Sequence, residues 1–183
     1  HVSAARILAK ENGVIAGHSY ASAVFHHLDG NLVYEDLKKD GEAVKKGELV
    51  ALIRGKTRAI LTGERVALNL LQRLSGIATT TRKYVDAVED TGAKILDTRK
   101  TSPGHRKKEK YAVRLGGGLN HRGNLSEMAL IKENHIYAAG SIEQAVRKIR
   151  GLSEIPIEVE VKNMTELKEA LKVSVDRIML DNW

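Results

Sequence analysis

The stretch KILDTRKT, residues 94–101, joins a short apolar run to a cluster of charged side chains. Its first half has the composition of a buried strand, and Asp97, Arg99 and Lys100 follow almost together. Strands that end in polar groups and alternate with helices are typical of α/β proteins, whose sites lie at the strand ends. We therefore expect further strand–helix units after this stretch.

After Gly92 the chain alternates short apolar runs with amphipathic stretches. The predicted strands are KILD (94–97), ALIK (129–132), IEVEV (157–161) and RIML (177–180). The predicted helices between them are KKEKYAVRL, SIEQAVRKIR and TELKEALK. This alternation predicts a parallel sheet or a (β/α) barrel. A complete eight-stranded barrel takes about 250 residues, so about four strands predict an incomplete barrel.

The residues before Gly92 have a different pattern. Asn12-Gly13 between two apolar runs predicts a β-turn or hairpin, and HSYASAVFHHLD predicts a helix. Strands follow to about Gly55, and two helices, separated near Gly76, are predicted from Thr57 to about Asp90. We therefore expect two domains, an α/β domain with connecting helices over residues 1–90 and a partial barrel over residues 91–183.

Composition excludes several classes of protein. With 42% hydrophobic and 29% charged residues, the 183-residue chain is globular rather than disordered. The absence of cysteine excludes disulfides and thiolate chemistry. No apolar run is long enough for a membrane span and no signal-peptide pattern is present, so we expect a cytoplasmic protein. Both ends fall within predicted structure, which predicts a fragment of a longer protein.

The net charge of +7 is concentrated in residues 94–122, which hold nine Lys and Arg against Asp97 and Glu109. A local excess favours a site for a small, highly charged anion over general polyanion binding. A nucleic-acid-binding module using this segment is an alternative. It lacks an aromatic platform, because Tyr111 is the only aromatic residue in the window.

Polar groups follow each predicted strand: residues 97–100, residues 132–135, Glu160, and residues 181–182. Glu158 and Glu160 alternate with valines, so both carboxylates should lie on one face of their strand. Taken alone, Lys132 is as readily a solvated loop residue, or the Schiff-base nucleophile of an aldolase. Together, the converging groups predict an active site. We expect the GGG of residues 116–118 to be a flexible loop, and only Lys110 of KKEK to point inward.

Five segments carry a resemblance to a known family: ERVALNLLQRLSGIATTTRKYVDAV, ILDTRKTSPGHRKKEKYAVRLGGGLNHR, LIKENH, IEVEV and IMLDN. Over essentially the whole chain, and in this order, they resemble the quinolinate phosphoribosyltransferases. The resemblance implies a small N-terminal α/β sandwich domain plus an incomplete (β/α) barrel. It also implies phosphoribosyl transfer from phosphoribosyl pyrophosphate to quinolinate with decarboxylation, giving nicotinate mononucleotide, pyrophosphate and CO2 in NAD biosynthesis. The alternative that the protein is a paralogue with a different heterocyclic substrate stays open.

The resemblance also implies roles for individual residues. The quinolinate pocket would contain Arg99, His121, Arg122 and Lys132, lined by Thr98 and Lys100. Glu160 and Asp181 would face the ribose and its Mg²⁺, and with Lys132 they would be the catalytic residues. Arg65 would enter the partner's active site in a homodimer, which could assemble further into a hexamer. The chain departs mildly from the family pattern at His105 and Glu133.

Overall fold

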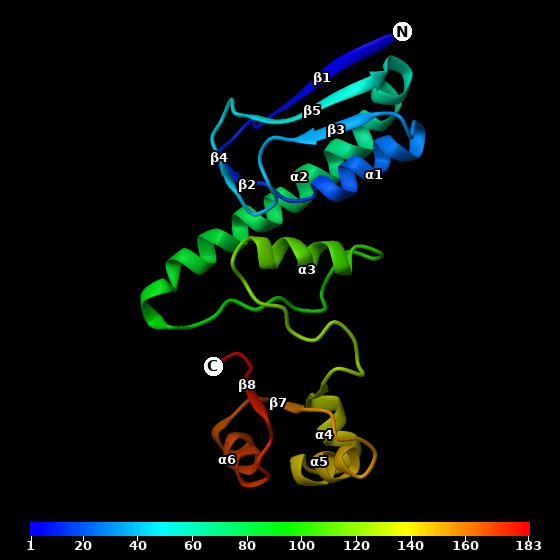
Figure 1. Ribbon diagram of the computed structural model, residues 1–183. Coiled ribbons are helices and arrows are strands. Elements are labelled where there is room, and N and C mark those ends of the chain that lie inside the picture. The colour runs from blue at the N-terminus through cyan, green and yellow to red at the C-terminus, as the bar shows by residue number, and fades with distance from the viewer. The chain divides into compact units, whose positions relative to one another are not determined.

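The computed structural model describes residues 1–183 and divides them into two compact units, an N-terminal unit, His1–His121, and a C-terminal unit, Arg122–Trp183. Figure 1 labels the elements of both. None of the helices combines the length and the hydropathy that a membrane-spanning helix needs.

The N-terminal unit contains two antiparallel sheets and three α-helices. Its elements are β1 (Val2–Leu8), β2 (Gly13–Val14), α1 (His18–Leu28), β3 (Val33–Asp36), β4 (Ala43–Val44), β5 (Leu49–Lys56), α2 (Thr57–Ala87), the short 3-10 helix η1 (Glu89–Thr91) and α3 (Arg106–Leu115). The larger sheet has the order β1-β5-β3, and β2 pairs with β4. Helix α1 confirms the helix predicted over residues 18–29.

Helices α1 and α2 cover one face of the β1-β5-β3 sheet (Figure 1). Along β1 the side chains alternate between exposed and half-buried positions, as expected when one face of a strand lies on a core. The core between the layers contains Phe25 of α1, Val50 and Ile53 of β5, and Leu71 of α2. Burial of these large apolar side chains holds the helices on the sheet.

Of the β-turn or hairpin predicted at Asn12-Gly13, the hairpin is wrong, because β1 pairs with β5 and β2 pairs with β4. The structure gives Gly13 another reason to be glycine. A Cβ atom there would lie 2.5 Å from Thr79 Oγ1 of α2. The neighbouring Val14 N–H donates to the same hydroxyl at 2.9 Å. Gly13 therefore allows β2 to approach α2 closely.

The prediction of two helices between residues 57 and 90 is also wrong, because α2 is continuous from Thr57 to Ala87. A glycine inside a helix costs only about 1 kcal/mol relative to alanine. Leu71 and Leu74 before Gly76, and Ala78 after it, are all buried. Their burial on both sides of Gly76 outweighs the cost of the glycine, so the helix does not break.

Gly116 and Gly118 are buried and closely packed, which corrects the prediction of a flexible loop over residues 116–118. A Cβ atom at Gly116 would lie 2.5 Å from the carbonyl oxygen of Ala78 in α2, and one at Gly118 would lie 2.9 Å from Cγ2 of Thr81. Arg82 of α2 donates its Nε–H to the Gly116 carbonyl at 3.0 Å. The loop that follows α3 is thus fixed against α2.

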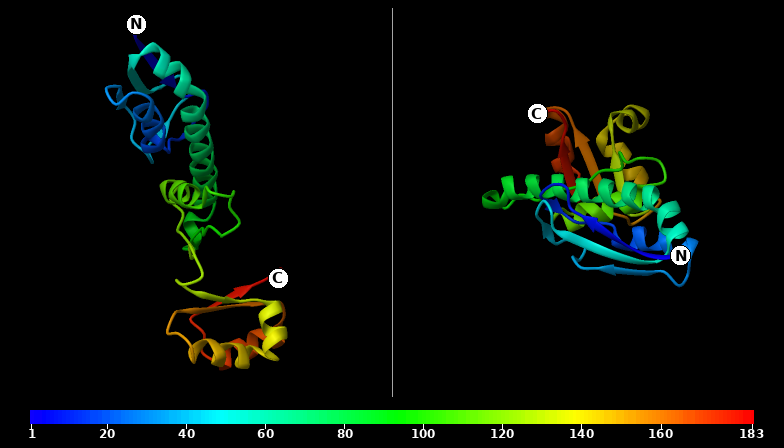
Figure 2. Two further views of the ribbon diagram at one scale, coloured as in Figure 1. Left: turned by 90° about the vertical axis from the view of Figure 1, so that its right-hand side faces the viewer. Right: turned by 90° about the horizontal axis from the view of Figure 1, so that it is seen from above.

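The C-terminal unit is a three-stranded parallel sheet, β6-β7-β8, with helices on one face (Figure 2). Its elements are β6 (Ala129–Ile131), α4 (Glu133–Ala139), α5 (Ile142–Arg150), β7 (Ile157–Val161), α6 (Met164–Lys172) and β8 (Arg177–Leu180). Ile131, Val159 and Val161 pack with Ile142 and Val146 of α5. Three of the four predicted strands and the helices α5 and α6 are confirmed, whereas α4 was not predicted.

The fourth predicted strand, residues 94–97, is not formed. Leu96 makes only an isolated parallel bridge to Leu119. A strand needs a neighbour along its length, and this segment has one only at residue 119. The unit therefore has three parallel strands where about four barrel strands were predicted.

Candidate active site

The segment that follows Asp97 is held in a compact turn. Lys100 N–H donates to Thr98 Oγ1 at 3.0 Å, and Thr101 N–H donates to the Arg99 carbonyl at 3.0 Å. Arg106 at the start of α3 donates to the same carbonyl and to the Thr101 hydroxyl. These contacts place the three predicted site residues, 98–100, beside the N-terminus of α3.

Arg99 has a property that the sequence could not show. Its Nε atom is buried and has no hydrogen-bond partner. A buried polar donor without a partner is costly, because it loses its hydrogen bonds to water and gains none in return. An anionic ligand would satisfy this donor, and guanidinium groups are well suited to carboxylates and phosphates.

His121 lies beside the same segment because its main chain is bound to Asp97 and Lys110. The His121 N–H donates to Asp97 Oδ1 at 2.8 Å, and Lys110 Nζ donates to the His121 carbonyl at 2.7 Å. Lys110 also forms an ion pair with Asp97. Lys110 points inward as predicted, but it is not the only such residue of KKEK, because Glu109 is buried as well. The role of Asp97 was missed. The proximity of 97 to 121 required the tertiary structure.

A second ion pair fixes the start of α3 to α2. Arg73 donates to Glu109 Oε1 and to Ser102 Oγ. Burial alone would raise the pKa of Glu109, but hydrogen bonds from Arg73 and Ser102 outweigh it and lower the pKa below its usual value. The carboxylate therefore stays ionised and holds the loop after Arg99 against α2.

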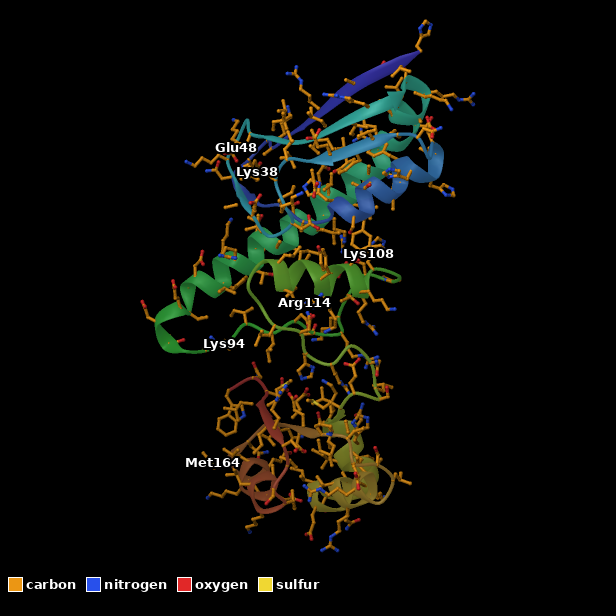
Figure 3. All side chains as sticks on the ribbon, viewed as in Figure 1. Lys38, Glu48, Lys94, Lys108, Arg114 and Met164 are labelled. Atoms are coloured by element: carbon orange, nitrogen blue, oxygen red, sulfur yellow. The ribbon has the colours of Figure 1, made fainter.

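Two other cations of the basic segment have structural roles. Lys108 lies 5.7 Å from the centre of the Tyr20 ring, and Arg114 lies 5.9 Å from the centre of the Tyr111 ring. Both cations project from α3 and are labelled in Figure 3. Both contacts are cation–π interactions. The Lys108–Tyr20 contact joins α3 to α1, whereas the Arg114–Tyr111 contact lies within α3. The local charge excess is thus shared between the candidate site and the helix surface.

Arg65 is exposed on α2 and forms no hydrogen bond or ion pair in the structure. It precedes Arg73, whose side chain reaches Ser102, by about 12 Å along the helix axis at 1.5 Å per residue. Arg65 therefore lies further toward the N-terminus of α2 than the point where α2 contacts the loop after residues 98–100. It makes no hydrogen bond or ion pair with the other predicted site residues.

In the C-terminal unit, three predicted site residues share one face of the sheet. Lys132 directly follows β6, Glu160 lies in β7 and Asp181 directly follows β8. The register pairs Leu130 with Glu158 and Glu160 with Met179, so alternation puts all three side chains on the face opposite the helices. This is the carboxyl edge of a parallel sheet, where α/β proteins assemble their sites.

Lys132 and Glu160 are in direct contact. Lys132 Nζ donates to Glu160 Oε2 at 2.6 Å, with 46% of the Lys132 side chain and 18% of the Glu160 side chain exposed. Glu158 is buried on the same face, with Arg177 3.8 Å away. The prediction that Glu158 and Glu160 share a face is confirmed. Arg122 donates to the carbonyl of Met128, just before β6.

Glu133 and Lys162 lie at the same edge and form an exposed ion pair at 2.7 Å. The hydrogen bond from Lys162 lowers the pKa of Glu133, and the same bond raises the pKa of Lys162. The Lys132 N–H donates to Nδ1 of the His135 side chain at 2.9 Å, and the His135 N–H donates to the Lys132 carbonyl at 2.8 Å, which caps the start of α4. These contacts order the residues around Lys132.

The side chains at the candidate site limit how a metal ion could be held there. No cluster of three or more His, Cys, Asp or Glu side chains could hold a metal ion, and one oxygen of Glu160 already accepts from Lys132. Mg²⁺ is usually held by one or two carboxylates together with substrate phosphates. Glu160 and Asp181 fit this arrangement, in which most of the metal ligands would come from the substrate.

The comparisons with known proteins agree along the whole chain. Residues 1–75 match the N-terminal domain of quinolinate phosphoribosyl transferase, and residues 77–183 match its C-terminal domain. A probable nicotinate-nucleotide pyrophosphorylase [carboxylating] of Synechocystis is 50% identical over 100% of this chain and 62% of its own length. One from Bacillus subtilis is 49% identical over 97% of this chain and 62% of its own length.

Two solved structures are also similar. The nicotinate-nucleotide pyrophosphorylase of Francisella tularensis has a TM-score of 0.97 and 42% identity, and NadC of Streptococcus pyogenes has a TM-score of 0.94 and 45% identity. All of this chain is covered in both comparisons, against 66% and 65% of those chains. The chain spans 62% of the length of the two curated relatives named above. These findings show that the chain belongs to the quinolinate phosphoribosyltransferase family.

Proposed function

We propose that the protein transfers the phosphoribosyl group of phosphoribosyl pyrophosphate to the nitrogen of quinolinate, with loss of CO2. The products are nicotinate mononucleotide and pyrophosphate, and the reaction belongs to NAD biosynthesis. Family membership and the placement of cations at the candidate site support this function. A cytoplasmic location stays a prediction, since two plant relatives are described as chloroplastic and mitochondrial.

The observation that carries the proposal is the buried Nε–H of Arg99, which has no partner in the protein. Quinolinate has carboxylates on adjacent ring carbons, so its binding requires several fixed cations. We assign Arg99, His121, Arg122 and Lys132 to the quinolinate pocket, with Thr98 and Lys100 as its lining. Charge-assisted hydrogen bonds from these groups would orient the ring nitrogen toward the anomeric carbon.

The C-terminal unit would supply the groups around the ribose. Glu160 and Asp181 share the sheet face of Lys132. Their negative charge would stabilise the positive charge that develops on the ribose as pyrophosphate leaves. Mg²⁺ is proposed to accompany the phosphates of the substrate, with these two carboxylates facing it. Once the ring nitrogen is quaternised, the bond to the neighbouring carboxylate would break and CO2 would leave. The electron pair would stay on the ring carbon, stabilised by the adjacent positive nitrogen, until that carbon takes up a proton.

We propose that the protein is a homodimer, which could assemble further into a hexamer, and that Arg65 acts in the partner's active site. The exposure of Arg65, and the absence of a hydrogen bond or ion pair to its side chain, support this assignment. We further propose that the chain consists of two domains, residues 1–90 and 91–183. The second would form part of an open (β/α) barrel.

Two other readings have less support. An amine nucleophile is activated in an apolar or cationic setting, whereas Lys132 is partly exposed and paired with a carboxylate. This environment disfavours a Schiff-base aldolase. Tyr111, the only aromatic residue of the basic segment, already faces Arg114 of the same helix, so the segment offers no free aromatic platform for a nucleic acid. A paralogue acting on another heterocycle would keep the same cations.

The test is quinolinate binding by Arg99→Ala, measured by isothermal titration calorimetry. A charge-assisted hydrogen bond is worth about 1.5–3 kcal/mol, so the dissociation constant should rise roughly 10- to 150-fold. Arg114→Ala is the matched control, because it removes the same charge from the same segment without touching the proposed pocket. An equal loss of affinity in both variants would show general attraction of the anion rather than a pocket at Arg99.

A further inference from the structure

We propose that Asp97 and Lys110 form a positioning pair that sets the place of His121 for substrate binding. The proposal rests on the proposed function, since it gives these residues their purpose through His121. Neither residue was assigned to the substrate pocket from the sequence. Their part is to hold the main chain from which the His121 side chain projects.

The pair binds both hydrogen-bonding groups of the His121 main chain. Asp97 Oδ1 accepts from the His121 N–H at 2.8 Å, and Lys110 Nζ donates to the His121 carbonyl at 2.7 Å. Lys110 and Asp97 are joined at 2.5 Å, and their side chains are 9% and 7% exposed. The second carboxylate oxygen of Asp97 accepts from the Asn120 side chain, which also donates to the Lys110 carbonyl.

The surroundings explain why such a pair is needed. Residues 120–123 belong to no helix or strand. The last backbone pairing before them is the bridge at Leu119, whose N–H donates to Ile95 and whose carbonyl accepts from Asp97. Beyond that bridge, hydrogen bonds to the side chains of Asp97 and Lys110 take the place of the backbone hydrogen bonds of a strand pair. They fix the loop where a sheet cannot.

Stability alone is a weak reason for this arrangement. A buried ion pair loses hydration that its attraction only partly recovers, and apolar replacements are often as stable. What apolar residues cannot do is satisfy the two main-chain groups of His121. Lys110 is also a firm point of attachment, because α3 is joined to α2 by Glu109 and packed on it by Ala112. The pair thus transmits the position of α3 to His121.

The experiment compares isosteric and conservative variants of the pair in the purified protein. Asp97→Asn keeps the shape but removes the charge and turns an amide donor toward Asn120 or His121. Lys110→Met removes the donor to the His121 carbonyl, and Lys110→Arg restores a cation. Glu109→Gln is the control, since it weakens the other ion pair of α3 without touching His121.

The readouts are the dissociation constant for quinolinate, from calorimetry, and the Michaelis constants for both substrates. Because small displacements of a positioning group cost about tenfold or more, Asp97→Asn and Lys110→Met should weaken quinolinate binding by about that factor. The Michaelis constant for phosphoribosyl pyrophosphate should stay unchanged. Lys110→Arg should recover part of the lost affinity. A purely structural role would affect both substrates alike, and Glu109→Gln would match the pair variants.

Each result has a defined meaning. If the unaltered protein binds no quinolinate, the proposed function fails, and this inference fails with it. If it binds quinolinate and both pair variants bind equally well, only the positioning role is overturned. Equal weakening in Glu109→Gln, or of both substrates, overturns it as well. If Asp97→Asn does not fold, judged by circular dichroism, then Lys110→Arg and Lys110→Met decide: equal affinity in these two contradicts the proposal.

Discussion

Gly116→Ala tests how closely the loop after α3 packs on helix α2. The backbone φ of Gly116 is −72°, so alanine meets no conformational strain there. The added methyl group, however, would lie 2.5 Å from the Ala78 carbonyl oxygen and 2.6 Å from Cβ of Thr81. Neither atom is the end of a flexible side chain. One belongs to the helix backbone and the other is attached to it, so relief requires the loop to move.

The size of the effect follows from the rigidity of that contact. Overpacking a core costs about 1–3 kcal/mol, and an obstructing helix backbone favours the upper part of that range. For a chain of this size, about 1 kcal/mol shifts the melting temperature by about 2–4 °C. At about 2–3 kcal/mol, Gly116→Ala should therefore lower the melting temperature by roughly 4–12 °C. Thermal unfolding followed by far-ultraviolet circular dichroism measures it.

Gly76→Ala is the control, because it makes the same change on α2 where no atom lies within 4 Å of the new methyl group. Alanine in an exposed helix interior should stabilise by about 1 kcal/mol. The two variants should therefore shift the melting temperature in opposite directions. An unchanged or raised melting temperature for Gly116→Ala would refute the close packing and restore the interpretation of a flexible loop.

Two more predictions follow from individual side chains. Burial lowers the pKa of His18 below its usual 6.5, against the opposing effect of nearby Asp40 and Asp36, so the folded state prefers the neutral ring. The stability contributed by neutral His18 is complete above that usual pKa and falls as the pH drops through it. The free energy of unfolding of His18→Phe, measured in urea between neutral and mildly acidic pH, should therefore depend less on pH than that of the unaltered protein. An equal pH dependence in both proteins would contradict this. If Arg65 acts across the proposed dimer interface, Arg65→Ala should abolish pyrophosphate release. Mixing it with Lys132→Ala should then restore part of it, because one site of the mixed dimer has every group intact. No recovery after demonstrated subunit exchange would place Arg65 in its own chain's site or give it a structural role.

The sequence was sufficient for features that depend on local pattern. Alternation of valine with glutamate predicted β7 and the shared face of Glu158 and Glu160, since side chains of a strand alternate by geometry alone. The 3.6-residue period predicted α1, α5 and α6. The clustering of positive charge near Lys94–Arg122 is a property of composition and needed no structure. These signals are contained within a few neighbouring residues.

The tertiary structure decided everything that depends on which segments become neighbours. Gly76 does not break α2, because burial of residues on both sides of it outweighs its low helix propensity. Gly116 and Gly118 are glycines because α2 lies against them, and residues 94–97 lack the partner that a strand requires. Asp97 gained its role only when folding brought it to His121, 24 positions along the chain. Such contacts are fixed by packing between distant segments, and no local pattern records them.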